Sequence, residues 1–261
     1  MTTEQLEPSR RLSDANLAKV MDLIKDAESV ELKLTIPSNA QRATIQGLPI
    51  DPVEAQPRQV FFFDTPDLAL QQAGVIVRAR RIRGGAADTV VKLRPVVPSD
   101  LPAKLRADPM FKTEVDLIPG GFMCSGSFKG ETTGQRVRDA VDRELPIRKL
   151  FSKQQRAFFT EHAPEGIELD ALTPLGPTFI LKGQFTPHEL GRKVTAEVWL
   201  YPDGSRVLEL STKSSPAAAF QVAAETRAYL TKVGVDLSGE QQAKTGAALQ
   251  FYAKEIEATH A

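Results

Sequence analysis

Two arginines, Arg78 and Arg80, lie two residues apart in an apolar, β-branched stretch. Such a composition is typical of a strand, whose successive side chains point to opposite faces, so the two arginines share one face. Two guanidinium groups on one face repel each other unless an anion lies between them. Their planar donor pattern matches phosphate oxygens, which makes a phosphate chain the favoured anion. For this strand alone, a face exposed to water is the ordinary alternative.

Charged residues recur at the same spacing elsewhere, with Val, Leu or Ile on the opposite face. The pairs are Glu31 and Lys33, Lys92 and Arg94, Glu114 and Asp116, Glu168 and Asp170, and Glu209 and Ser211. An ordinary sandwich would show the same alternation with its charges in bulk water. Basic and acidic pairs, however, fall on different segments. A closed barrel with a charged interior and an apolar exterior explains this sorting more simply.

Composition limits the kind of partner that the chain can bind. The 261 residues include 33 Lys and Arg against 33 Asp and Glu, so the formal net charge is zero. This balance does not support non-specific binding to DNA or to an anionic membrane. The single cysteine, Cys124, excludes an intrachain disulfide and fits a reducing compartment. We find no signal peptide and no membrane span, so we expect a cytoplasmic protein.

The segment pattern predicts one α+β domain over residues 1–261. We expect an N-terminal arm at residues 1–12, a barrel over residues 28–213 and helices over residues 214–258. The strand-like segments are 30–36, 58–63, 75–83, 89–94, 112–117, 166–172, 178–185, 193–201 and 206–212. Residues 95–110 are expected to be loop, and residues 118–147 a glycine-rich insertion with a short helix. Residues 149–160 fit a strand or a helix.

Enclosing the charged faces in one cavity would bury many cations, which is unfavourable without an anion or paired acids. The basic set is Lys33, Arg78, Arg80, Lys92 and Arg94, with Lys153, Arg156, Lys182 and Lys213 as less regular members. The acidic set is Glu31, Glu114, Glu168, Asp170, Glu197 and Glu209. Carboxylates would repel a phosphate chain unless a divalent cation bridged them, and oxygen ligands suit Mg²⁺ or Mn²⁺. Such an ion would polarise a terminal phosphoryl group or activate a water.

Other chemistries have less support in the sequence. Three histidines in loop or terminal positions do not indicate a histidine-based triad or a zinc site. No nucleotide-binding loop or dinucleotide fingerprint is present. Trp199 shares a strand face with Glu197, and it would either stack on a base or pack within the barrel.

The motif Phe62-Phe63-Asp64-Thr65-Pro66-Asp67, followed by Arg78-x-Arg80 and Lys92-x-Arg94, resembles the CYTH family, also called triphosphate tunnel metalloenzymes. The similarity covers residues 28–213, and the later acidic strands and C-terminal helices fit it. The resemblance implies a closed eight-stranded antiparallel β-barrel that binds triphosphate-containing ligands. Known activities of the family are inorganic triphosphatase, thiamine triphosphatase, RNA 5′-triphosphatase and class IV adenylate cyclase.

The resemblance, together with the charged set above, implies a role for each group. The expected phosphate-binding residues are Lys33, Arg78, Arg80, Lys92, Arg94, Arg156 and Lys182. The expected metal ligands, for Mg²⁺ or Mn²⁺, are Glu31, Glu114, Glu168, Asp170 and Glu209. We expect Glu31, Lys33 and Arg80 to act in catalysis.

Two carboxylates of the family pattern are replaced by hydroxyls here. The family's first strand reads Glu-x-Glu-x-Lys, but the first position is Ser29, and the acidic pair of the last strand reads Glu209-Leu210-Ser211. A serine brings no negative charge, so the site attracts a metal less and the cavity is more electropositive. Either the remaining carboxylates still hold a metal for triphosphate hydrolysis, or the tunnel is a non-catalytic binding module for polyphosphate or a nucleotide. An adenylate cyclase is the third hypothesis.

Overall fold

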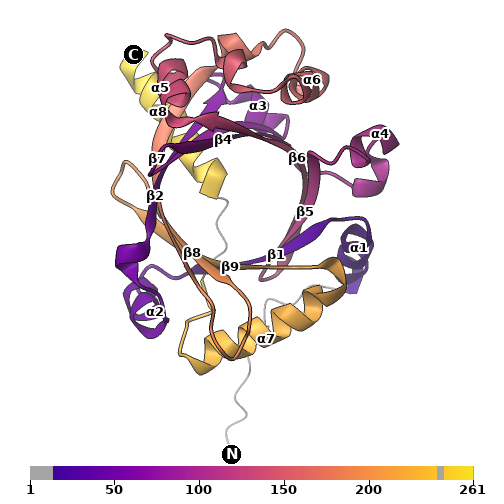
Figure 1. Cartoon of the computed structure of the whole chain (residues 1–261), viewed down its shortest axis with the longest axis vertical. Coiled ribbons are helices and arrows are strands. Elements are labelled where there is room, and N and C mark those ends of the chain that lie inside the picture. The colour runs from indigo at the N-terminus through magenta and orange to yellow at the C-terminus, as the bar shows by residue number, and fades with distance from the viewer. Residues whose placement is uncertain (1–13, 240–243, 261) are drawn as a thin grey trace, which may run out of the picture.

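The strands form a closed barrel with helices outside it (Figure 1). The computed structural model describes residues 14–239 and 244–260, so the expected arm at residues 1–12 lies outside the described residues. The nine strands are β1 (Ser29–Ile36), β2 (Gln56–Asp64), β3 (Val75–Ile82), β4 (Ala86–Leu93), β5 (Phe111–Ile118), β6 (Gly121–Thr133), β7 (Thr173–Phe185), β8 (Val194–Leu200) and β9 (Arg206–Ser214). Their order around the barrel is β1-β5-β6-β4-β3-β2-β7-β8-β9, and β9 pairs with β1.

Short helices and four longer ones surround the barrel. The α-helices are α1 (Asp14–Lys25), α2 (Gln41–Gly47), α3 (Ala69–Gln72), α4 (Ala103–Arg106), α5 (Gly134–Val141), α6 (Lys153–His162), α7 (Ala219–Lys232) and α8 (Lys244–His260). The 3-10 helices are η1 (Pro52–Glu54), η2 (Pro98–Asp100), η3 (Ile147–Leu150), η4 (Leu169–Ala171) and η5 (Pro216–Ala218). The ambiguous segment 149–160 is thus mostly helix α6. None of the helices in the described part of the chain is long and apolar enough to cross a membrane.

The predicted closed barrel with flanking helices is confirmed, but the prediction of eight antiparallel strands was wrong. The barrel has nine strands, and β1 runs parallel to β5 while it runs antiparallel to β9. The parallel pair aligns Glu31 with Asp116 and Ser29 with Glu114. Two neighbouring strands therefore direct acidic residues to the same part of the interior.

Strand β6 was expected to be a glycine-rich loop, and close packing explains the glycines. A Cβ at Gly126 would lie 2.5 Å from the ring of Phe111, and one at Gly130 would lie 2.6 Å from the side-chain oxygen of Gln155. Gln155 is fully buried on α6, and its amide donates to the carbonyl oxygens of Thr89 at 3.2 Å and Phe128 at 3.3 Å. The glycines of β6 thus make room for the side chains that fix α6 to the barrel.

The segment 166–172 was expected to be a strand, and this prediction was also wrong. It forms a loop and the 3-10 helix η4, in which Leu169 is buried against the outer core. Asp170 forms an ion pair with Arg148, and its carboxylate also accepts a hydrogen bond from the backbone N–H of Arg148 at 2.8 Å. The alternation of charged and apolar residues in this segment therefore reflects packing outside the barrel, not a strand in its wall.

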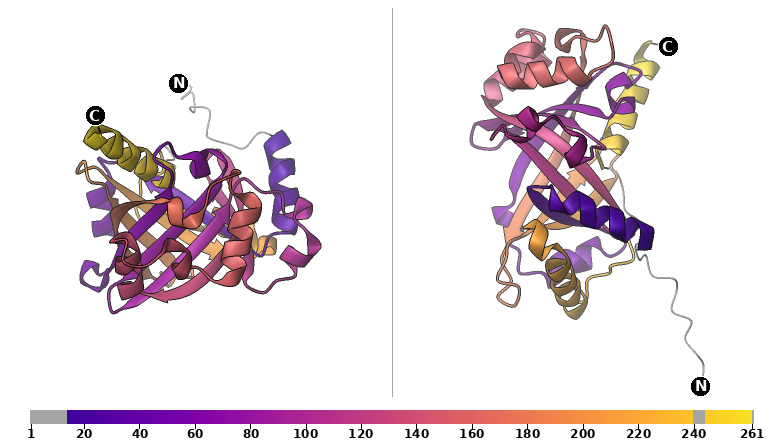
Figure 2. Two further views of the ribbon diagram at one scale, coloured as in Figure 1. Left: turned by 90° about the horizontal axis from the view of Figure 1, so that it is seen from above. Right: turned by 90° about the vertical axis from the view of Figure 1, so that its right-hand side faces the viewer.

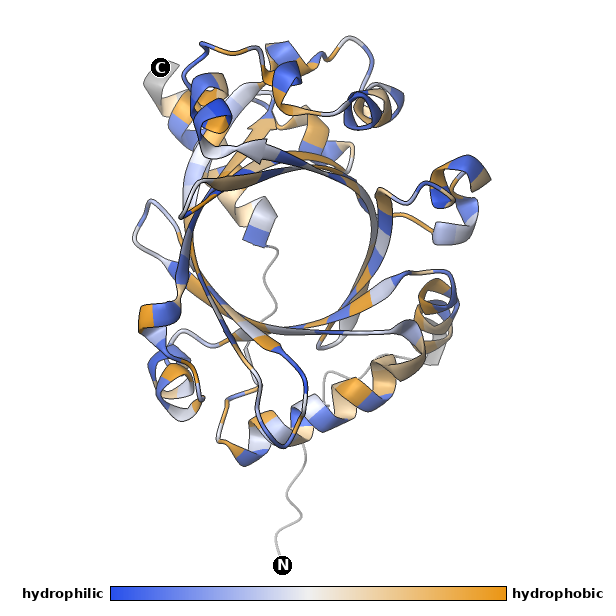
Figure 3. Ribbon diagram, in the orientation of Figure 1, coloured by the Kyte–Doolittle hydropathy of each residue, from blue (hydrophilic) through white to orange (hydrophobic). Residues whose placement is uncertain are grey.

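The barrel wall separates charged from apolar side chains, as its alternating pattern predicted. Colouring by hydropathy shows hydrophilic and hydrophobic residues alternating along the strands (Figure 3). Outward residues such as Phe61, Phe63 and Val77 form a core with helices α1, α5 and α6, and the strands are inclined to the barrel axis (Figure 2). A second hydrophobic cluster, at one end of the barrel, includes Trp199 of β8 and Tyr252 of α8.

Asp64 of the Phe-Asp-Thr-Pro-Asp motif holds the turn between β2 and β3. Its buried carboxylate accepts hydrogen bonds from the backbone N–H groups of Thr65 at 2.8 Å, Leu70 at 2.9 Å and Gln71 at 3.0 Å. The hydroxyl of Thr65 accepts from the N–H of Ala69 at 2.8 Å. The motif thus begins helix α3 and sets the path of the chain into β3, where the arginines lie.

We expect Asp64→Ala to destabilise the protein by about 2–3 kcal/mol, because it leaves three backbone donors without their acceptor. Urea denaturation checks this value. Asp67→Ala is the matched control, since Asp67 belongs to the same motif but is exposed; it is expected to change stability by less than about 0.5 kcal/mol. Equal effects of the two substitutions would contradict the role of Asp64.

Candidate functional site

The barrel encloses a cavity of about 850 Å³ that is lined mainly by charged side chains. Its basic lining residues are Lys33, Arg78, Arg80, Lys92, Arg94, Lys129, Lys182, Lys213 and Lys244. Its acidic lining residues are Glu31, Asp88, Glu114, Asp116, Glu131, Glu197 and Glu209. The cations and the acids are not evenly mixed, and their distribution defines three regions.

The first region is a group of cations on and after β3 and β4: Arg78, Lys92 and Arg94. None of them forms an ion pair with a carboxylate of the described residues, and the Nε of Arg78 has no hydrogen-bond partner. Burial lowers the pKa of all three, to about 10 for Arg78 and to about 8 for Lys92; Arg80 adds repulsion at Arg78. This region therefore holds positive charge that is uncompensated in the sense that no carboxylate of the described residues forms an ion pair with it, which favours an anionic ligand.

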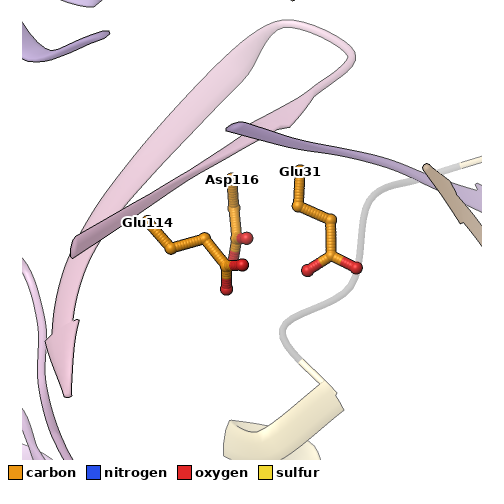
Figure 4. Close-up of side chains that lie close together, drawn as sticks. All are labelled: Glu31, Glu114 and Asp116. Carbon is orange, nitrogen blue, oxygen red and sulfur yellow. The ribbon is translucent and has the colours of Figure 1, made fainter. Parts of the chain in front are cut away.

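The second region is an acidic cluster of Glu31, Glu114 and Asp116, in which one carboxylate oxygen from each residue lies within 4.8 Å of the other two. Figure 4 shows the three side chains pointing into the same space from β1 and β5. The Nζ of Lys33 lies 2.7 Å from Asp116 and 3.4 Å from Glu31. Burial disfavours the charged form of Lys33, but Asp116, Glu31 and Glu209 outweigh it and raise its pKa.

Glu114 is held in its charged form within this cluster. Burial would raise its pKa, but the ion pair with Lys213, together with Lys92 and Lys33, lowers it to about 2. One oxygen of Asp116, Oδ1, is buried and has no hydrogen-bond partner. Charged oxygen donors, one of them unsatisfied, fit a hard divalent cation, so the cluster could hold a metal ion with Lys33 and Lys213 as competing cations.

The third region consists of ion pairs that neutralise one another. Arg80 binds Asp88, with its Nε 2.9 Å from Oδ2, and Lys182 lies 3.9 Å from Glu197. Glu209 forms a buried ion pair with Lys244 of α8. These pairs line the cavity without adding an uncompensated charge to it.

The two serines stand beside the acidic cluster. The hydroxyl of Ser29 donates to Glu114 at 3.5 Å. Ser211 pairs in register with Lys33 and lies between Glu209 and Lys213 on the same strand face. Neither serine is among the residues that line the cavity, but the hydroxyl of Ser29 contacts Glu114 of the acidic cluster.

Three residues of the predicted site lie outside the cavity: Arg156, Glu168 and Asp170. Arg156 lies on α6 and donates to the carbonyl oxygen of Phe151 at 2.8 Å, while Glu168 is exposed before η4. The expectation that these three share the barrel interior was wrong, because neither of their segments is a strand of the barrel. Lys153, also on α6, does not line the cavity either.

The structure brings the other predicted residues together in the cavity, and their roles in binding and catalysis stay predictions. They are Glu31, Lys33, Arg78, Arg80, Lys92, Arg94, Glu114, Lys182 and Glu209. The predicted set omitted Asp88, Asp116 and Lys244. Asp116 follows Glu114 at a spacing of two residues, which indicated that both lie on one strand face. The same alternation, extended back from Lys92 along its strand, could have indicated Asp88. No sequence signal connects Lys244, which lies on a helix, with the barrel.

We expect Lys92→Met to stabilise the unliganded protein at pH 6–7 by about 3 kcal/mol, because burial lowers the pKa of Lys92 from 10.5 to about 8 and each unit corresponds to about 1.4 kcal/mol. The pKa of Lys92 is about 8 in the folded protein, whereas a lysine in water has a pKa of 10.5. Below pH 8 the buried ammonium is therefore charged and lowers the free energy of unfolding. As the pH rises from 8 to 10.5 the folded protein loses this proton first, and the cost disappears. The advantage of the variant should therefore shrink over that range.

Urea denaturation in chloride buffers free of phosphate, at several pH values, measures this difference. Lys112→Met is the control, because Lys112 lies on β5 with a half-exposed side chain and does not line the cavity. A Lys92→Met variant that is less stable than the wild type at pH 7 would show that Lys92 is not a buried uncompensated charge.

Comparisons with known proteins identify the fold. No family model and no curated protein matches the chain. A solved structure of a candidate adenylyl cyclase from Hippeastrum, whose description reports a dominant triphosphatase activity, is similar with a TM-score of 0.59 and 16% identity, over 81% of this chain and 91% of that one. A candidate adenylate cyclase from Bacillus halodurans is similar with a TM-score of 0.56 and 11% identity, over 83% and 96%. At these identities the comparison shows a shared fold.

Proposed function

We propose that the chain is a member of the CYTH family that binds a triphosphate-containing ligand inside the barrel and hydrolyses its terminal phosphoanhydride with Mg²⁺ or Mn²⁺. The observation that carries this proposal is the uncompensated group of Arg78, Lys92 and Arg94 next to a cluster of three carboxylates in one enclosed cavity. The shared fold with a protein described as a triphosphatase supports it.

In the proposed mechanism the cations bind and orient the phosphate chain. Arg78, Lys92 and Arg94 contact its non-bridging oxygens, and Asp116 is near enough to influence the pKa of Lys92 and Arg94. A divalent ion bound by Glu31, Glu114 and Asp116 would polarise the terminal phosphoryl group.

The chain's own residues then direct the displacement. Glu31 orients a water whose oxygen attacks the terminal phosphorus while the bridging P–O bond breaks. Lys33 and Arg80 stabilise the charge that builds on the departing phosphate, and Asp88 fixes the position of Arg80. Tripolyphosphate and water would give diphosphate and orthophosphate.

A second candidate function is a non-catalytic receptor for polyphosphate or a nucleotide. The observation that favours it is the chemistry around the acidic cluster: Ser29 and Ser211 supply no charge, and Lys33 and Lys213 already neutralise part of the cluster. A receptor would bind the phosphate chain through the cations alone. Adenylate cyclase is the third hypothesis, and its product would be cyclic AMP.

We expect tripolyphosphate to raise the melting temperature in chelator as well as with Mg²⁺ or Mn²⁺, because the uncompensated cations do not need a metal to bind an anion. Arg78→Ala should weaken this binding at least about tenfold, the effect of losing one charge-assisted contact. Arg83→Ala is the control, since Arg83 is exposed outside the cavity. Equal losses in both variants would remove Arg78 from the site.

Product assays on the same samples separate the three functions. The hydrolase releases phosphate from tripolyphosphate or another triphosphate only with metal, the receptor releases none, and the cyclase converts ATP to cyclic AMP. Absence of any stabilisation by tripolyphosphate would contradict the proposal of a triphosphate site.

We expect Ser29→Glu to raise the affinity for Mn²⁺ by about five- to tenfold, because it adds a fourth carboxylate beside Glu114 and affinity follows the charge of the ligand set. Calorimetric titration without phosphate measures this directly, and metal-dependent turnover should rise with it. Ser38→Glu adds the same charge at an exposed position and serves as the control. An unchanged Mn²⁺ affinity in Ser29→Glu would show that the missing carboxylate does not limit the metal site.

A further inference from the structure

The start of helix α8 brings one more cation, Lys244, into the end of the barrel. In Figure 1 this end of the helix is visible through the barrel, and Lys244 and Thr245 line the cavity. The helix is held there by buried Leu249 and Tyr252 in the cluster with Trp199. The hydroxyl of Tyr201 donates to the carbonyl oxygen of Lys244 at 3.3 Å, which fixes the first turn of the helix.

Lys244 neutralises the acids at this end of the cavity. Its ammonium forms an ion pair with Glu209, and the side chains of Lys244 and Glu209 are 12% and 8% exposed. The same ammonium is the leading charge that favours the ionised form of Glu197. Without Lys244, Glu209 would be a buried carboxylate with Lys33 as its remaining cation.

Lys244 also covers the aromatic surface of Trp199. Its Nζ lies 5.0 Å from the centre of the indole ring, in cation–π contact. The other aromatic rings that line the cavity, Phe62 and Phe128, are 1% and 4% exposed. Within the described lining of the cavity, no aromatic face is therefore open for a nucleobase to stack on.

We propose that Lys244 is a specificity-determining residue that makes the tunnel prefer an unsubstituted inorganic phosphate chain to a nucleoside triphosphate. The inference rests on the proposed function, because it concerns the same cavity. Lys244 favours the chain in two ways: it neutralises Glu209 through the ion pair, and it covers the ring of Trp199, which is 5% exposed. Selectivity thus comes from α8, whereas the general affinity for phosphate comes from the barrel strands.

The test compares the affinities for tripolyphosphate and ATP in chelator, by calorimetry, for the full-length wild type and Lys244→Met. The wild type should bind tripolyphosphate more tightly than ATP. In Lys244→Met the affinity for tripolyphosphate should fall about tenfold, the equivalent of about 1.4 kcal/mol, and the affinity for ATP much less. The ratio of the two affinities should therefore fall at least about fivefold. Lys254→Met removes an exposed lysine of the same helix and should leave both affinities unchanged.

The single tryptophan gives a second readout. Trp199 is the only tryptophan of the chain, so the tryptophan fluorescence reports on its surroundings, which include Lys244. Lys244→Met should change the emission spectrum of the unliganded protein, while Lys254→Met should not. Lys244→Arg keeps the charge and should keep the discrimination. If Lys244→Met lacks a cooperative thermal transition, Lys244→Gln replaces it with the same expectations.

Two results separate this inference from the function on which it rests. A wild type that binds neither tripolyphosphate nor ATP overturns the triphosphate site itself. A wild type that binds tripolyphosphate, together with a ratio of affinities that is unchanged within about twofold in Lys244→Met, overturns the role of Lys244 alone.

Discussion

The structure depends on the confinement of like charges within a closed wall. Arg78, Lys92 and Arg94 lie where water is limited and where the chain offers them no carboxylate at ion-pair distance. Burying cations in this way lowers the stability of the protein, and the apolar outer cores must offset this loss. An anion that binds next to these cations removes the electrostatic cost of burying them, so this free energy contributes to the affinity for the ligand. Five other cations of the cavity already pair with carboxylates, which restricts this effect largely to one region: Lys33, Arg80, Lys182, Lys213 and Lys244.

The parallel pairing of β1 with β5 determines where the acids collect. It places Glu31 beside Asp116 in register, and Glu114 one step away beside Ser29. The same pairing positions Lys33 to contact two of them. A metal ion would therefore compete with Lys33 for the same carboxylates.

Much of this architecture could be predicted from the sequence, because a strand with one charged and one apolar face leaves a clear period of two. The pattern located Arg78, Arg80, Lys92 and Arg94 correctly on the inner face. It failed at Glu168 and Asp170, where the same period arises in a loop whose acid pairs with Arg148. It also missed β6, since Gly126 and Gly130 resemble turn residues but make room for Phe111 and Gln155. Contacts between distant segments decide such cases, as they do for Lys244, and local periodicity contains no information on them.

Closure of the barrel joins the two ends of its sequence: Val30 of β1 lies opposite Ser214 of β9. During synthesis, β1 to β6 can assemble into an open sheet, but the ring is incomplete until β7, β8 and β9 have left the ribosome. Contacts of such large sequence separation form slowly, so we infer that an open sheet with free edges precedes the ring. Its concave side carries the lysines, arginines and acids, which water solvates well at that stage. The charged side chains that make the finished interior costly are thus solvated until the last strands close the ring.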